Sequence, residues 1–157
     1  MIVRILAVGG PGKLLAGSIQ EFETRARRYW RLEVHEVDAG KGGTRAQNVV
    51  QEEEARRLFK KVSPGGALVA LTRKGRGMSS PGLARFLQQR AVRSVPHVTF
   101  VLGGAHGLSE EFLDKASLRL SLSPLTLPHD LARLVLMEQI YRAGTILKGE
   151  PYHKGAS

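Results

Sequence analysis

Short apolar runs alternate with longer amphipathic stretches along the chain, and this alternation predicts the elements of the fold. The apolar runs have the β-branched or alternating character of strands at residues 2–8, 32–37, 67–71, 98–102 and 118–122. Apolar residues recur at helical spacing at residues 14–29, 44–62, 80–93 and 129–147, with a short further helix after Ser109. Strands that alternate with helices predict an α/β fold, with a mainly parallel sheet and helices on both faces.

Local signals set the expected boundaries of these elements. Thr44 precedes Gln47 by three residues, which is the spacing of a capping box, so we expect a helix from Thr44 to about Val62. Ser80 and Pro81 are expected to begin the next helix. The basic segment 72–78 (TRKGRGM) contains two glycines and is predicted to be a flexible loop.

Length and composition place the chain among small globular proteins. A chain of 157 residues is expected to form a single domain spanning residues 1–157. No apolar stretch reaches the ~20 residues needed to span a bilayer, so we expect no membrane partner. The apolar start of the chain has the pattern of a buried strand rather than a signal peptide, and a cytoplasmic location is expected.

The charge balance says more about possible partners of the chain than its overall composition does. Lysine and arginine total 24 against 14 acidic residues, giving a formal net charge of +10. Such a balance favours nucleic acid as a partner, because neutralised phosphates release counterions; an anionic membrane surface, an acidic protein and a solvated basic face remain alternatives. The sequence has no cysteine, and its five histidines lack ligand spacing, so we predict no metal site.

Ligands of parallel α/β sheets bind in the loops that follow the strands, and two such loops are unusual here. The glycine-rich segment 103–107 follows a strand and precedes a helix; it is either a close approach to a ligand or simply a tight turn. The apolar segment 122–128 carries two prolines, so it is neither a helix nor a central strand. It is either a binding surface for a group such as adenine or a loop that caps the core.

The C-terminal region has two further features. The helix 129–147 is apolar on more than one side, which favours a second copy of the chain as its partner. The tail contains Tyr152 and His153, which are able to stack on a base and handle a proton, and Arg142 precedes them on the helix. A solvated tail without a function is the alternative.

Several segments together resemble the ribosomal RNA large-subunit methyltransferase H family, which is one of the α/β-knot (SPOUT) methyltransferases. The matching segments are VDAGKGG at 37–43, LGG-x-x-GLS at 102–109, SLSPLTLPH at 121–129, LARLVLMEQIYRA at 131–143 and PYHK at 151–154. They extend over nearly the whole chain, and their combination is far more specific than any one of them.

The resemblance implies a fold and an activity that the pattern alone does not give. It implies a C-terminal trefoil knot, a homodimer, and methylation of N3 of a pseudouridine in large-subunit rRNA of the assembled ribosome. It implies that S-adenosylmethionine contacts Leu71, Gly103, Leu122, Ser123, Pro124, Leu125, Thr126 and Leu127. We further expect His153, Tyr152 or Arg142 to polarise or deprotonate N3, reaching the cofactor of the other subunit.

Three further points concern the contacts with phosphate, the role of residue 106 and the alternative functions. Arg73, Lys74 and Arg76 are expected to bind rRNA phosphates. The family often has a small or acidic pair at positions 105–106, whereas this chain has Ala105 and His106, and the role of His106 is undecided. A non-catalytic basic RNA- or ribosome-binding factor of the same fold is the alternative function, and a tRNA methyltransferase of this fold is a third.

Overall fold

The computed structural model describes residues 1–155, except for the side chain of His153. The strands are β1 (Ile2–Val8), β2 (Arg31–Val37), β3 (Ala67–Gly77), β4 (His97–Leu102) and β5 (Leu118–Ser121). The helices are α1 (Lys13–Ala26), α2 (Gln47–Phe59), α3 (Ser80–Val92), α4 (Glu110–Lys115) and α5 (His129–Leu147), followed by the short 3-10 helix η1 (Pro151–Gly155).

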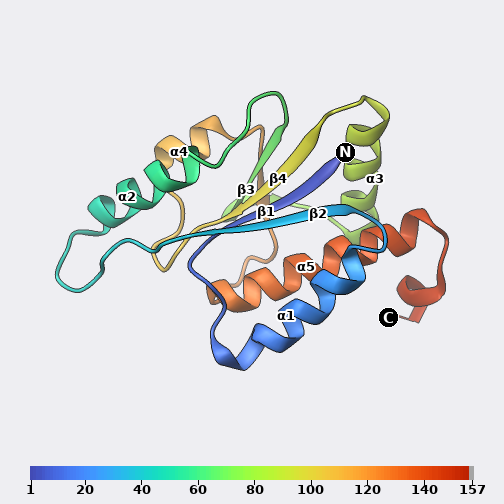
Figure 1. Ribbon diagram of the computed structural model, residues 1–157, viewed down its shortest axis with the longest axis horizontal. Helices are drawn as coiled ribbons and strands as arrows, with labels where there is room; N and C mark the ends of the chain where they lie inside the picture. The colour runs from blue at the N-terminus through green and yellow to red at the C-terminus, as the bar shows by residue number, and fades with distance from the viewer. Residues whose placement is uncertain (156–157) are drawn as a thin grey trace.

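The strands form one parallel sheet in the order β2-β1-β4-β3-β5. Helices α1 and α5 lie side by side on one face, and α2 and α4 lie on the other (Figure 1). Helix α3 packs against α5. The α/β class, the parallel sheet and the two helical layers are therefore confirmed, whereas the trefoil knot stays a prediction.

Each face of the sheet carries its own apolar core. Phe100, Leu136 and Met137 are fully buried where α1, α3 and α5 cover the sheet. Leu6 and Phe112 are fully buried beneath α2 and α4. Burying side chains of this size contributes about 1.5–3 kcal/mol each to folding. The two cores therefore hold the helical layers against the sheet, and this fixes the positions of the strand ends.

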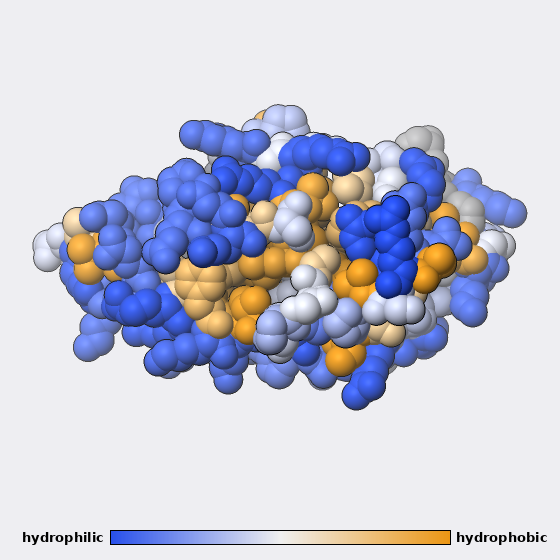
Figure 2. Space-filling view, turned by 90° about the horizontal axis from the view of Figure 1, so that it is seen from above, coloured by the Kyte–Doolittle hydropathy of each residue, from blue (hydrophilic) through white to orange (hydrophobic). Residues whose placement is uncertain are grey.

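The face that carries α2 and α4 also has apolar side chains at its surface. Seen from above, they gather in a hollow in the middle of the molecule, with hydrophilic side chains around it (Figure 2). Among the described residues, no helix is both long and apolar enough to cross a membrane.

The predicted loop 72–78 is wrong, because β3 continues to Gly77. Leu71 and Arg76 both face Leu120 of β5, so residues 72–75 leave the ladder and the strand resumes pairing after them. Glycine at 75 is needed there, since a Cβ atom would lie 2.7 Å from the carbonyl carbon of Arg119. The local glycine signal was therefore correct for an irregularity but not for the end of the strand.

The predicted cap at Thr44 is also wrong. Helix α2 begins at Gln47 after Ala46, which makes no side-chain capping hydrogen bond, and it ends at Phe59 rather than Val62. Thr44 lies in an exposed turn instead. A capping box requires the threonine to stand directly before the first turn, and here two further residues separate it from the helix.

Candidate functional site

A cavity of about 860 Å³ lies at the carboxyl ends of β3, β4 and β5. Three chain segments form most of its wall: 71–74, where β3 leaves its regular pairing, 102–108 from the last residue of β4 onward, and 122–129 before and into α5, with Pro124 outside the lining. Sites for small organic ligands occupy roughly 300–1,000 Å³ and lie at this edge of parallel sheets. The position and the size of the cavity therefore suit a cofactor.

The glycine turn at 103–107 brings backbone to the wall of this cavity. A Cβ atom at Gly103 would lie 2.7 Å from the carbonyl carbon of Gly107, so a larger residue forces the turn to shift. Gly107 has a φ of 75°, which favours glycine, and its N–H donates to the carbonyl oxygen of Gly104 at 3.0 Å. The turn is both tight and part of the cavity, so the segment can be a tight turn and a place of close approach to a ligand at the same time.

The segment 122–128 is held by polar contacts of its own. Ser121 donates from its hydroxyl to the carbonyl oxygen of Ser123 at 3.0 Å, and the N–H of Leu125 donates to the Ser123 hydroxyl at 3.0 Å. Leu122 packs against the core, whereas Leu125 is 73% exposed. The segment is therefore a shaped wall of the cavity with one outward-facing apolar side chain, rather than a cap over the core.

The structure brings together most residues that were expected to contact the cofactor. Those that line the cavity are Leu71, Gly103, Leu122, Ser123, Leu125, Thr126 and Leu127. Their role in binding stays a prediction.

The basic residues after Leu71 divide into two groups. Arg73 and Lys74 are exposed and line the cavity, whereas Arg76 is exposed outside the lining. Arg73 donates to the Thr126 hydroxyl at 3.0 Å and so joins the β3 irregularity to the 122–128 segment. Two positive side chains therefore stand at the entrance of the cavity, where a phosphate backbone is able to approach.

Sequence reasoning missed a polar link beside the cavity. His129 lines it, with Nε2 at 2.9 Å from Oδ1 of Asp130. Oδ2 of Asp130 accepts from the N–H of Gly12 at 2.7 Å. The link fastens the loop after β1 to the first turn of α5, and no sequence signal beyond an acidic residue at a helix start pointed to it.

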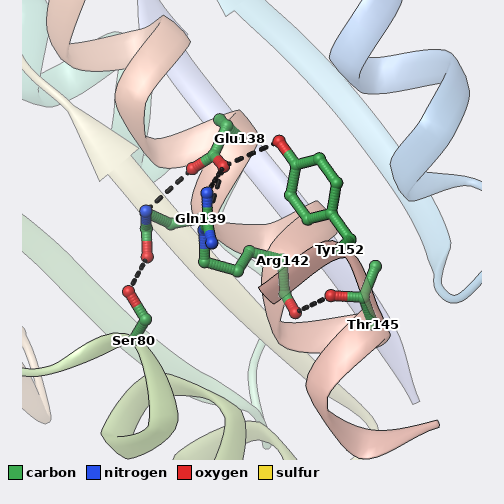
Figure 3. A network of polar contacts seen from close by, with 6 residues as sticks. All are labelled: Ser80, Glu138, Gln139, Arg142, Thr145 and Tyr152. Atoms are coloured by element: carbon green, nitrogen blue, oxygen red, sulfur yellow. Dashed lines mark hydrogen bonds and ion pairs between the residues drawn. The ribbon is translucent and has the colours of Figure 1, made fainter. Parts of the chain in front are cut away.

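Tyr152 and Arg142 meet at a carboxylate rather than at the cavity (Figure 3). Oε1 of Glu138 accepts from the Tyr152 hydroxyl at 3.0 Å and from Nη2 of Arg142 at 2.7 Å. The Arg142 guanidinium lies 4.9 Å from the centre of the Tyr152 ring, which also packs edge-on against Tyr141. The tail is therefore ordered against α5 as far as Tyr152; the side chain of His153 lies outside the described residues.

The environment of this cluster fixes its protonation. Burial raises the pKa of Tyr152, and the hydrogen bond to Glu138 raises it further. The same carboxylate raises the pKa of Arg142. At neutral pH the phenol is protonated and the guanidinium is charged, so both groups donate hydrogen bonds and neither accepts a proton.

The cluster lies further along α5 than the cavity does. Ala132 is the last residue of α5 in the cavity lining, and Arg142 follows ten residues later, which at 1.5 Å per residue is about 15 Å along the helix. Within one chain, Arg142 and Tyr152 therefore lie outside the lining that the predicted cofactor residues form.

Apolar side chains are exposed to solvent near the start of α5, where this helix lines the cavity. Leu14 is 92% exposed in the first turn of α1, and Leu131 is 36% exposed in the first turn of α5. The contact between Gly12 and Asp130 holds these two helix starts together. Exposed leucines on adjoining helix ends suit contact with another protein surface.

No group of three or more metal-ligating side chains is found among the described residues.

Comparison of the sequence with known proteins identifies its family. Residues 1–153 match the family model described as "Predicted SPOUT methyltransferase". The ribosomal RNA large subunit methyltransferase H of Gemmatimonas aurantiaca is 46% identical over 98% of this chain and 100% of its own length. The protein of the same name from Acetivibrio thermocellus is 41% identical, with the same coverage of both chains.

Solved structures agree at the level of the fold. A probable methyltransferase from Bordetella pertussis superposes with a TM-score of 0.55 at 13% identity, covering 90% of this chain and 95% of that one. A probable methylase family protein from Haemophilus influenzae gives a TM-score of 0.53 and covers 96% and 69%. With relatives that match along nearly its whole length, the chain belongs to the SPOUT methyltransferase family, in the group named ribosomal RNA large subunit methyltransferase H.

Proposed function

We propose that the protein transfers a methyl group from S-adenosylmethionine to N3 of a pseudouridine in large-subunit ribosomal RNA, on the assembled ribosome in the cytoplasm. The observation that carries the proposal is the 46% identity, over 98% of this chain, to a protein named for methylation of this RNA. The charge of +10 and the two cations at the cavity entrance suit an RNA substrate.

The cavity fits the cofactor on physical grounds. A wall of backbone at Gly103, Gly104 and Gly107 allows close approach, while Leu71, Leu122 and Leu127 supply apolar surface for an adenine ring. Bound there, the cofactor supplies an electrophilic methyl group on a positive sulfonium, so the protein's task is chiefly to position the two reactants.

The acceptor nitrogen is the harder part of the reaction, because N3 of pseudouridine carries a proton at neutral pH. Arg142 has guanidinium N–H groups besides the two that bind Glu138, so it suits the carbonyl oxygens that flank N3 and the negative charge that develops there as the proton leaves. The single O–H of Tyr152 is donated to Glu138, so Tyr152 helps to hold the cluster in place. The base is then His153, the remaining tail residue with a suitable ordinary pKa.

A second copy of the chain completes this site. Arg142 lies about 15 Å along α5 from Ala132, the last residue of that helix in the cavity lining, and Tyr152 packs beside Arg142, so we assign both to the cavity of a partner. The exposed Leu14 and Leu131 beside the cavity suit the surface on which the partner docks. The homodimer thus supplies cofactor residues from one chain and tail residues from the other.

The test of this function is methylation of ribosomes that lack the modification, with isotope-labelled S-adenosylmethionine and mass spectrometry of the rRNA. The proposal predicts one labelled methyl on a pseudouridine of large-subunit rRNA. A protein that binds ribosomes but takes up no S-adenosylmethionine in calorimetry is instead the non-catalytic binding factor, and label on tRNA indicates the third function.

The base assignment has a test of its own. His153→Ala should lower turnover and remove a limb of its pH profile between about pH 5 and 8, the range in which histidine titrates. Unchanged turnover with an unchanged profile would remove His153 from the mechanism without affecting the cofactor site.

A further inference from the structure

Glu54 is a buried carboxylate directly behind the cavity wall. It lies on α2 and is 4% exposed. Its Oε2 accepts from the N–H of Gly40 at 2.9 Å, whereas its Oε1 is buried without a hydrogen-bond partner. A buried acceptor left unpaired costs free energy, so its retention calls for a reason beyond holding the Gly40 loop.

The carboxylate is in contact with the glycine turn of the cofactor cavity. A Cβ atom at Gly104 would lie 2.9 Å from each oxygen of Glu54, so the glycine allows the negative group to come up against the turn. Gly104 itself lines the cavity. Gln51, one turn earlier on α2, donates to the carbonyl oxygen of His106 at 2.7 Å and holds the same turn against the helix.

The carboxyl group of Glu54 has no cation as its partner. The neighbouring cations pair with Glu53 instead: Arg45 contacts its Oε1 and Arg57 lies 3.9 Å from its Oε2. Within residues 1–155, Glu54 forms no ion pair. A buried and unpaired charge is screened less by water and salt than an exposed one.

The charged side chains that line the cavity are mostly positive, in contrast to the carboxyl group of Glu54 behind its wall. Arg73, Lys74 and Arg119 line it against one acidic residue, Glu110, and of the three cations Arg119 pairs with Asp114 at 2.8 Å. Arg73 and Lys74 suit RNA phosphates, but they disfavour a further positive charge inside the cavity. The methyl donor is such a charge: its sulfonium is positive, and the thioether product that leaves after methyl transfer is neutral.

We propose that Glu54 carries its negative charge behind the wall and thereby makes the cavity select the positively charged methyl donor over its neutral product. The proposal rests on the proposed function, because it requires the cavity to bind S-adenosylmethionine. Glu54 acts through the field it sets up behind Gly104 and does not touch the reacting atoms. It offsets the basic lining that serves the RNA, and it favours exchange of spent cofactor for fresh donor.

The test is the ratio of the dissociation constants of S-adenosylmethionine and S-adenosylhomocysteine, measured by calorimetry. Glu54→Gln keeps the shape and an acceptor for Gly40 but removes the charge, so the ratio should shift by about tenfold against S-adenosylmethionine. Glu52→Gln is the matched control, because it removes an exposed charge two positions away on the same helix and should leave the ratio unchanged.

Three other outcomes are informative. If Glu54→Gln weakens both ligands equally, the residue has only a structural role and the proposal is overturned. Unchanged affinity for both ligands overturns it as well. If the unmodified protein binds neither ligand, the proposed function fails first, and this inference fails with it.

A measurement on the unmodified protein covers the case in which Glu54→Gln does not fold. The same ratio is followed from low to high salt, and selection by a buried carboxylate predicts a change below about twofold. A preference for S-adenosylmethionine that disappears in salt would assign the selection to exposed charges and overturn the role of Glu54.

Discussion

The Tyr152 hydroxyl donates a hydrogen bond at 3.0 Å to the same oxygen of Glu138 that accepts two hydrogen bonds from Arg142. The carboxylate of Glu138 thus positions both Arg142 and Tyr152 in the proposed active site. It also connects through Gln139 to Ser80 at the start of α3, so the cluster is fixed to the body of the protein (Figure 3).

Replacing Glu138 with glutamine tests this arrangement. The amide keeps an acceptor oxygen but loses the charge that strengthens the bonds from Arg142 and Tyr152, so turnover should fall by at least about tenfold. The affinity for S-adenosylmethionine should stay within about twofold, because Glu138 does not line the cavity and its cluster is assigned to the RNA rather than to the cofactor. Single-turnover kinetics and calorimetry measure the two quantities, and a loss of affinity with normal turnover would contradict the assignment.

A second tyrosine fastens the chain just before the tail. Tyr29 donates a hydrogen bond to Oε2 of Glu150, and this bond, with burial as the second cause, raises the pKa of Tyr29 from 10.0 to about 12. The folded state therefore holds the phenol proton more tightly than the unfolded chain does. Its contribution to stability should be complete below pH 10 and be lost as the pH rises towards 12.

Phenolate absorbance measures this pKa, with Tyr29→Phe subtracted to isolate the residue. Glu150→Gln should bring the pKa down towards its ordinary value. An unaltered titration in Glu150→Gln would show that Glu150 does not hold Tyr29 in solution.

The tight glycine turn predicts that one methyl group added at Gly103 impairs cofactor binding. Gly103→Ala places a Cβ atom 2.7 Å from backbone of Gly107, which cannot move without altering the cavity wall. The dissociation constant of S-adenosylmethionine should rise by at least about tenfold. Gly17→Ala is the control: it lies in α1 with open space around it, and it should leave binding intact while stabilising the helix by up to about 1 kcal/mol.

The basic segment of β3 predicts a salt-dependent contact with RNA. Replacing Arg73, Lys74 and Arg76 together with glutamine should weaken ribosome binding and reduce the slope of log affinity against log salt by up to about three. A matched triple variant uses Lys60, Lys61 and Arg93, which are exposed near the opposite ends of the strands. Equal slopes for the two variants would mean that the segment does not contact phosphate.

The sequence predicted the layers of the fold because buried strands and amphipathic helices differ in period. It failed where long-range pairing decides the structure. Residues 76–77 join β3 because β5 lies beside them, and no local signal carries that information. The Thr44 error has the same origin, since a spacing that suits a cap does not show where the chain turns into the helix.

The candidate site was predicted in part, and for different reasons. Gly103 and the 122–127 segment were found because glycine and proline in an apolar setting mark unusual backbone. Glu54 was missed because it stands in a run of three glutamates, a pattern typical of a solvated helix face. Glu138 was missed because its role depends on residues four and fourteen positions later, which α5 and η1 bring together.

The central claim is that the active site combines the cavity of one chain with the tail of another. It is tested most directly by mixing two variants under conditions that exchange subunits, at an S-adenosylmethionine concentration too low for the cavity variant to bind it. One variant carries Gly103→Ala in the cavity, and the other carries Tyr152→Phe and Arg142→Gln in the α5–tail cluster. In a mixed dimer, one site has both an intact cavity and intact tail residues.

The account predicts that equal amounts of the two variants, each inactive alone, regain about a quarter of the rRNA methylation of the unmodified protein, because half of the randomly formed dimers are mixed and each has one complete site. If the mixture stays as inactive as its components although mixed dimers have formed, the cavity and the tail residues must act within one chain, and the account is contradicted.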